Sequence, residues 1–190
     1  KEAYSDFLVG KDNKLLGLGS LEYDLFCEGL ARSFWGAGLR PEGSLASYLD
    51  LGNWRPWGLA VVDGSKRCGF KTAPGSAENY SLSPERNVNL LHAHNIEVVA
   101  AAPELLQQMA SDFKKEGLES PFKQLWSFSA ISSKDELKEG HINCERVLNL
   151  WGTDEGFIRM ECLFGGMHYW EDISILEVVS GSGEGPLEEG

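Results

Sequence analysis

Apolar side chains recur at helical spacing in two stretches of the chain. In Leu21–Trp35 they return every three or four positions, and Ser20 stands where an N-cap is expected. In Pro103–Glu116 the proline suits the first helical position, and Gly117 suits the residue that follows a helix. The pattern therefore predicts one helix over each stretch. The predicted buried stripes are Leu21, Leu25, Leu30 and Phe34 in the first helix and Leu105, Leu106, Met109 and Phe113 in the second.

Shorter elements are predicted between these helices. Ser44–Leu51 favours a short helix. Leu59–Val62 and Arg67–Phe70 flank Asp63-Gly64, a dipeptide typical of tight turns, so they predict a β-hairpin. The segments that follow are predicted to be a polar loop over 72–87 and, because β-branched residues favour strands, a strand within Asn89–Ala101.

The last third of the chain alternates strand-like segments with turn signals. Glycine-rich turns at 152–156 and 165–166 separate segments rich in aromatic and β-branched residues. Short connections of this kind favour antiparallel pairing in a meander. We therefore expect an α+β fold, with an antiparallel sheet of about four to six strands and two or three helices on one face. The predicted strands are Lys123–Ile131, Ile142–Trp151, Phe157–Phe164 and Tyr169–Val179.

Length and composition indicate one globular unit. The chain has 190 residues, of which 42% are hydrophobic, enough to bury a core without disulfides or metals. We expect a single domain over 1–179 and a flexible acidic tail over 180–190, where aromatic and β-branched residues are missing. No window approaches 18 consecutive apolar residues, and no signal-peptide pattern opens the chain, so membrane insertion is not expected.

The charge balance selects among partners. The formal net charge is −12, and most of the acidic excess lies after residue 100. Such a chain is repelled by phosphate backbones and anionic lipid head groups, so nucleic-acid binding is not expected. The acidic surface either keeps the protein soluble or docks a protein partner that has a basic surface.

An aromatic segment offers a second recognition feature. Trp54, Arg55 and Trp57 lie in a stretch that breaks regular structure. Tryptophan and arginine are frequent anchors at protein interfaces, so these three residues are the predicted partner-binding site. The alternative is that the rings fold back and fill the open end of the sheet.

Recognisable catalytic signatures are absent from the sequence. It contains no GxSxG elbow, no GxxxxGK[ST] loop, no GxGxxG after a strand and no HExxH. We therefore predict a non-catalytic accessory subunit, without catalytic residues, metal or cofactor, that docks a partner through the aromatic segment and the acidic surface.

The alternative is a small-molecule pocket or a metal-assisted enzyme. His92 and His94 would share one face of a strand, and with Glu97 the segment resembles the first motif of the cupin family, which implies a metal site. The order of predicted elements resembles the NTF2-like fold, which implies a pocket. Asn143-Cys144-Glu145 resembles the NC box of LRAT-like acyltransferases, which implies a cysteine nucleophile.

The four cysteines lie far apart in the sequence, with no CxxC pair among them. This spacing is unlike a disulfide-stapled secreted domain, and we expect core residues, although the sequence leaves open whether they are free or paired. They are Cys27, Cys68, Cys144 and Cys162.

Overall fold

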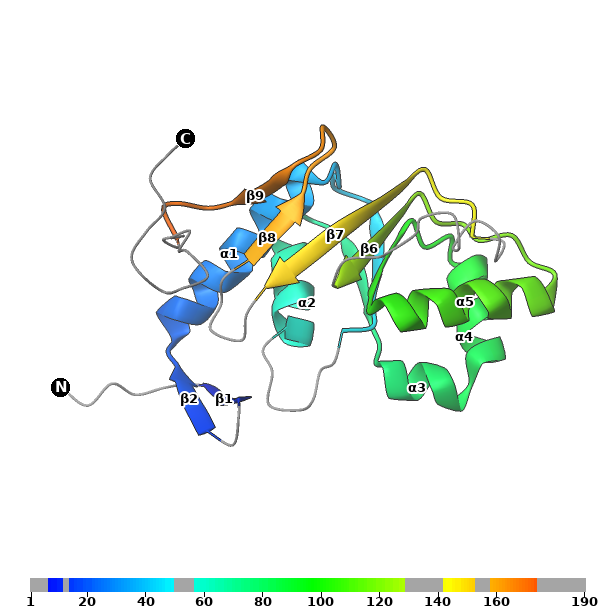
Figure 1. Ribbon diagram of the computed structural model, residues 1–190, viewed down its shortest axis with the longest axis horizontal. Coiled ribbons are helices and arrows are strands. Elements are labelled where there is room, and N and C mark those ends of the chain that lie inside the picture. The colour runs from blue at the N-terminus through cyan, green and yellow to red at the C-terminus, as the bar shows by residue number, and fades with distance from the viewer. Residues whose placement is uncertain (1–6, 12–13, 50–56, 129–141, 153–157, 174–190) are drawn as a thin grey trace, which may run out of the picture.

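The computed structural model describes residues 7–11, 14–49, 57–128, 142–152 and 158–173. Side chains are described from Gly19 onward. The predicted tail over 180–190 lies outside these ranges, and the single domain over 1–179 stays a prediction. The described residues form a layered structure in which helices lie on both sides of a central sheet (Figure 1).

The central sheet is mixed. Within the described residues it has seven strands in the order β4-β3-β5-β6-β7-β8-β9, and the pairs from β4 through to β7 are parallel. β8 pairs antiparallel with β7, and β9 pairs antiparallel with β8. β1 and β2 form a separate hairpin near the N-terminus. The strands are β1 (Phe7–Lys11), β2 (Lys14–Leu18), β3 (Ser44–Ser47), β4 (Lys71–Pro74), β5 (Val98–Ala101), β6 (Gln124–Phe128), β7 (Arg146–Gly152), β8 (Ile158–Glu161) and β9 (Met167–Tyr169).

Helices connect the parallel strands. The described helices are α1 (Ser20–Gly36), α2 (Trp57–Arg67), α3 (Ala77–Leu82), α4 (Pro84–Ala93) and α5 (Pro103–Glu116). Helix α2 links β3 to β4, and α5 links β5 to β6, which is the connection that parallel strands require. Figure 1 shows α1 and α2 on one side of the sheet and α3, α4 and α5 on the other.

Each face of the sheet carries its own hydrophobic core. Under α1 and α2, the rings of Phe34 and Trp126 stack with centroids 4.8 Å apart. Under α4 and α5, Phe113 meets Phe122 edge to face at 5.3 Å. Because residues alternate along each strand, β5 sends Val98 and Ala100 to the first core and its other two side chains to the second.

The predicted fold class is wrong. The expected antiparallel meander with helices on one face is instead a mostly parallel sheet with helices on both faces. The short connections near the C-terminus did indicate antiparallel pairing correctly, but only for β7 through β9. The parallel pairing of β6 with β7 contradicts the meander most directly.

The largest local error is the predicted hairpin over 59–70. Residues 59–67 of this stretch belong to α2, and Asp63-Gly64 lies inside the helix. Its buried positions follow the helical period at i, i+3, i+4, i+7 and i+8, which a strand cannot produce. The dipeptide Asp63-Gly64 favours a hairpin, but the helical period of the buried residues describes the structure. The buried residues are Trp57, Gly58, Ala60, Val61, Gly64 and Ser65.

Other segments also differ from expectation. The predicted helix over 44–51 contains strand β3, and the predicted loop over 72–87 contains most of β4, all of α3 and the start of α4. The strand predicted within 89–101 is confined to β5. The helix over Pro103–Glu116 is confirmed residue for residue, and the first helix is confirmed with Gly19, not Ser20, as its N-cap.

Helices α1 and α2 cross closely at Gly64. A Cβ atom there would lie 3.0 Å from the Leu30 Cβ and 3.1 Å from the Cys27 carbonyl oxygen. We expect Gly64→Ala to lower the free energy of unfolding by about 1–3 kcal/mol, measured by urea denaturation, because backbone cannot yield to the new methyl group. Gly36→Ala is the control, since no atom lies within 4 Å of its Cβ position; an equal loss there would contradict the crossing argument.

Candidate functional site at the carboxyl ends of the parallel strands

The chain reverses its direction of travel across the sheet between β3 and β5. From the carboxyl end of β3 it passes through α2 on one face to β4. From the carboxyl end of the neighbouring β5 it passes through α5 on the other face to β6. Adjacent strands whose connections diverge in this way leave a crevice outside their carboxyl ends, where open α/β sheets bind their ligands. We call this place the switch-point crevice.

Small and polar residues line the sheet end of the switch-point crevice. The Ser47 hydroxyl at the end of β3 is buried and has no hydrogen-bond partner among the described residues. The next residue, Tyr48, donates its hydroxyl to Asn87 Oδ1 at 3.2 Å, and burial raises its pKa to about 12. Tyr48 is therefore an uncharged hydrogen-bonding group at neutral pH.

Helix α5 begins at the same edge. Its N-cap is Ala102, which has extended backbone angles (φ −65°, ψ 151°) and supplies no side-chain cap. The first N–H groups of an α-helix lack intrahelical partners and carry a partial positive charge. In α5, Pro103 has no N–H, the Leu105 N–H donates to the Ala102 carbonyl oxygen at 3.1 Å, and Glu104 is an acidic residue of the first turn. The helix dipole is therefore the feature of this start that favours an anionic group.

Aromatic side chains form the side of the crevice toward α1 and α2. Trp57 opens α2 and is 4% exposed. Its ring lies 5.0 Å from that of Phe26 and 4.6 Å from that of Phe128, the last residue of β6. These three rings cover the end of the apolar core at the carboxyl edge of the sheet, so the surface beside them is hydrophobic.

The carboxyl end of β7 and the beginning of β8 lie at this same edge of the sheet. β7 ends at this edge with Trp151 and Gly152, which pair with Arg159 and Ile158 at the beginning of β8. The Arg159 guanidinium lies 4.4 Å from the centre of the Trp151 ring. Together these contacts fix where β7 stops and β8 begins beside the crevice.

The predicted partner-binding residues are only partly described. Trp57 is buried between two aromatic rings, so its indole is not presented to a partner. Trp54 and Arg55 lie outside the described residues, in the stretch that joins β3 to α2. For Trp57, the alternative in which the rings close the end of the sheet describes the structure better.

The two histidines do not lie on a strand. His92 is in the last turn of α4, with Nδ1 3.0 Å from the Glu119 carbonyl oxygen, and His94 is the C-cap. His94 lines an apolar cavity of about 250 Å³ between α4 and the strands β3 and β4. No group of three or more metal-ligating side chains converges anywhere in the described part of the chain. The prediction that His92 and His94 share one face of a strand and bind one metal ion is therefore wrong.

The four cysteines form no disulfide bond with one another. Cys27 is buried, as expected of a core residue, and burial raises the pKa of its thiol. Cys144 and Cys162 both line a cavity of about 280 Å³ beside β7 and β8. Cys162 Sγ also lies 3.1 Å from His168 Nε2, a pair six residues apart that the sequence reading did not connect.

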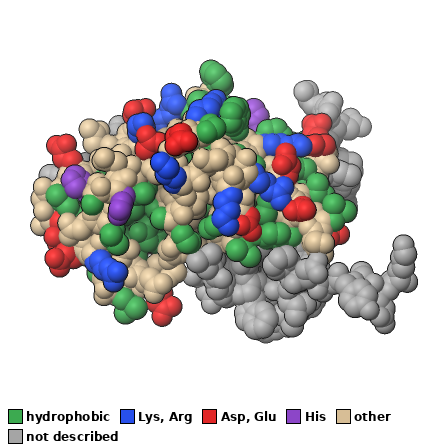
Figure 2. Space-filling view, turned by 180° about the vertical axis from the view of Figure 1, so that it is seen from behind, with side chains coloured by type: hydrophobic (Ala, Val, Ile, Leu, Met, Phe, Trp, Pro, Cys, Tyr) green, Lys and Arg blue, Asp and Glu red, His purple; other side chains and the backbone are tan. Residues whose placement is uncertain are grey.

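The partner protein with a basic surface stays a prediction. On the side shown in Figure 2, basic and acidic side chains are interspersed. Among the described residues, no helix is both long and apolar enough to cross a membrane.

The chain is similar to proteins of known function in both sequence and structure. No protein-family model matches the chain. A phenylacetate-coenzyme A ligase from Thermus thermophilus is 27% identical over 186 residues, which cover 93% of this chain and 40% of the ligase. A crystal structure of 2-hydroxyisobutyryl-CoA ligase in an open conformation, in complex with 2-HIB-AMP and CoA, matches with a TM-score of 0.81 and 20% identity. It covers all of this chain and 47% of the ligase.

A third similar protein is MbtA from Mycobacterium smegmatis, whose apo structure matches with a TM-score of 0.67 and 16% identity. The match covers 96% of this chain and 34% of that protein. The chain thus spans less than half the length of each of these relatives. Two of these similar proteins are CoA ligases, which are enzymes, and this finding contradicts the predicted non-catalytic accessory subunit.

Proposed function

We propose that this chain is the part of an acyl-CoA-forming ligase that provides the switch-point crevice for an acyl adenylate. In such a reaction a carboxylate attacks the α-phosphorus of ATP and releases pyrophosphate. The thiol of CoA then attacks the acyl carbon and releases AMP. Both steps require a site that holds a nucleotide monophosphate ester beside the organic acid. The names of the similar ligases suggest the reaction, and the strand order of this chain suggests that the adenylate binds at the switch-point crevice.

The observation that carries the proposal is the switch point of the sheet, in a chain whose whole length matches 47% of a CoA ligase. The start of α5 has no side-chain cap and suits the phosphate, because the helix dipole favours an anion there. The buried Ser47 hydroxyl adds an unpaired polar group at the same edge, where unpaired groups call for a ligand or water. The aromatic cluster at Trp57 favours an apolar organic group beside it, away from the phosphate at the start of α5.

Isotope exchange between pyrophosphate and ATP tests the proposal in the protein that carries this chain. We expect exchange only when a carboxylic acid is present, because pyrophosphate is released when the adenylate forms. Addition of CoA should convert the adenylate to a thioester and release AMP. A panel of aryl and short branched carboxylic acids that supports neither exchange nor AMP release would overturn the proposal.

A further inference from the structure

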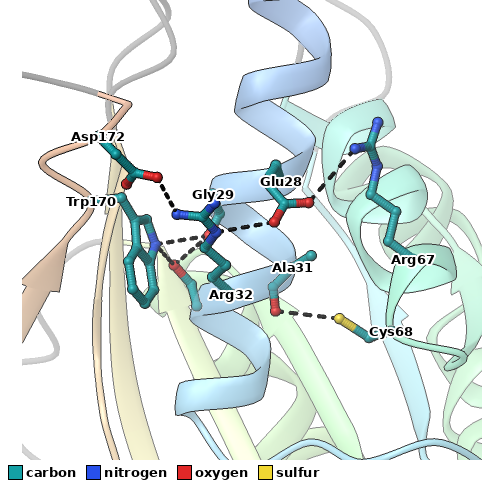
Figure 3. A network of polar contacts seen from close by, with 9 residues as sticks. Glu28, Gly29, Ala31, Arg32, Arg67, Cys68, Trp170 and Asp172 are labelled. Atoms are coloured by element: carbon teal, nitrogen blue, oxygen red, sulfur yellow. Dashed lines mark hydrogen bonds and ion pairs between the residues drawn. The ribbon is translucent and has the colours of Figure 1, made fainter.

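The segment after β9 is fastened to the middle of α1. The Trp170 indole N–H donates to the Gly29 carbonyl oxygen at 3.0 Å and to Ser33 Oγ at 3.2 Å. Two residues on, the Asp172 carboxylate accepts from Arg32 Nη1 at 2.7 Å. Figure 3 shows Trp170 and Asp172 on one side of α1, with Arg32 reaching toward them. We call these contacts the α1 clasp.

Arg32 is the centre of the α1 clasp. Its Nε donates to Glu28 Oε1 at 3.0 Å, and its guanidinium carbon lies 5.6 Å from the centre of the Trp170 ring. The bond from Arg32 lowers the pKa of the Asp172 carboxyl, so this ion pair is present at neutral pH. Glu28 also faces Arg67 on α2 at 3.8 Å, which connects the clasp to the second helix. The clasp therefore joins three separate parts of the chain.

The contacts in the α1 clasp differ in strength. Both ion-pair side chains are more than one third exposed, so water and salt weaken their attraction. The Trp170 indole is half-buried, and it donates to a backbone carbonyl of a rigid helix. We therefore expect the indole N–H to be the stronger contact and the arginine to fix its orientation.

The α1 clasp holds the edge of the sheet together with two contacts of β8, the buried Met160 side chain in the core under α1 and the hydrogen bond from Asn149 N–H to the Glu161 carboxylate at 2.8 Å. β9 has three residues and is the edge strand, and β8 has four. β8 in turn pairs with the last three residues of β7 at the carboxyl edge. Because β8 pairs with both β9 and the end of β7, we expect loosening of the segment after β9 to reach the carboxyl end of β7 through β8.

We infer that Arg32 and Trp170 are positioning residues that hold β8 and β9 in register and so fix the carboxyl end of β7 beside the switch-point crevice. Neither residue belongs to the crevice itself. The effect on nucleotide binding rests on the proposed function, whereas the effect on β8 and β9 does not.

Hydrogen exchange read by mass spectrometry tests the strand-holding role. Trp170→Phe keeps an aromatic ring and removes the N–H donor, and Arg32→Ala removes the ion pair. We expect exchange in 158–161 and 167–169 to become about tenfold faster or more in each variant, while the strands β3, β5 and β6 stay unchanged. Arg32→Lys should restore part of the protection, because it keeps the charge opposite Asp172.

Lys66→Ala is the matched control, since it removes an exposed ion pair with Asp63 that lies outside the clasp. Unchanged exchange in both strands of Trp170→Phe, or equally faster exchange throughout the sheet, would overturn the inference. For the crevice, we expect the KM for ATP to rise about three- to tenfold with kcat within about twofold of wild type. If the wild-type protein shows no ATP-dependent activity, the proposed function fails and the exchange data alone decide the role of the clasp.

Discussion

Trp57→Ala is expected to lower the free energy of unfolding by about 3–5 kcal/mol, because it removes a buried indole and leaves a cavity. The ring packs edge to face against both Phe26 and Phe128, which join α1 and β6 to the start of α2. A loss of this size is a large share of the stability of a typical domain, about 5–15 kcal/mol. Urea denaturation followed by circular dichroism measures it.

Trp35→Ala provides the comparison within the same chain. Trp35 is 50% exposed at the end of α1 and contacts Arg40, whose guanidinium carbon lies 4.4 Å from the ring centre. We expect its replacement to cost about 1 kcal/mol or less, since an exposed cation–π contact is weak. Losses of similar size in the two variants would show that Trp57 does not close the carboxyl edge as described.

The sequence could predict the elements whose boundary signals and hydrophobic period agree. Helix α5 has a proline at its first position, an apolar stripe and a left-handed glycine after its last residue, and its bounds were predicted correctly. Strands β6, β7 and β8 lie within or largely overlap the predicted Lys123–Ile131, Ile142–Trp151 and Phe157–Phe164, whereas β9 (Met167–Tyr169) shares only its last residue with the predicted Tyr169–Val179. Local chemistry is sufficient where each signal supports the same element.

The parallel part of the sheet could not be predicted in the same way. β3, β4 and β5 have only four residues each, too few to show a period, and their partners lie far apart in the sequence. The helical period of α2 was present, but Asp63-Gly64 favoured a hairpin there. Once α2 was read as a hairpin, the alternation of strands and helices that defines a parallel sheet was lost.

The candidate site was missed for the same reason. A switch-point crevice is a property of strand order, and its residues look unremarkable in the sequence: Ser47 and Ala102 belong to no catalytic motif. Trp57 was noticed, but its role depends on burial, which the loop-like composition around it concealed. The proline at the start of α4 was the overlooked signal that a helix precedes β5.

Ala102→Asp should raise the free energy of unfolding and weaken ATP binding. The extended backbone of Ala102 suits an N-cap, so Ala102→Asp and Ala102→Asn should each raise the free energy of unfolding by about 0.5–2 kcal/mol through a new side-chain cap. The aspartate also places a negative charge where we propose that the phosphate binds. We expect Ala102→Asp to weaken ATP binding about tenfold or more relative to Ala102→Asn, because like charges repel at close range.

The affinity of these two variants for ATP, determined by calorimetric titration of the protein that carries this chain, is the most direct test of the switch-point crevice as a nucleotide site. Asparagine and aspartate have nearly the same shape and cap a helix equally well, so a difference between them reports charge alone. The account predicts that both variants unfold at higher urea concentration than wild type and that Ala102→Asp binds ATP about tenfold or more weakly than Ala102→Asn. Equal affinity of the two variants for ATP would show that the nucleotide does not bind at the start of α5 and would contradict the account.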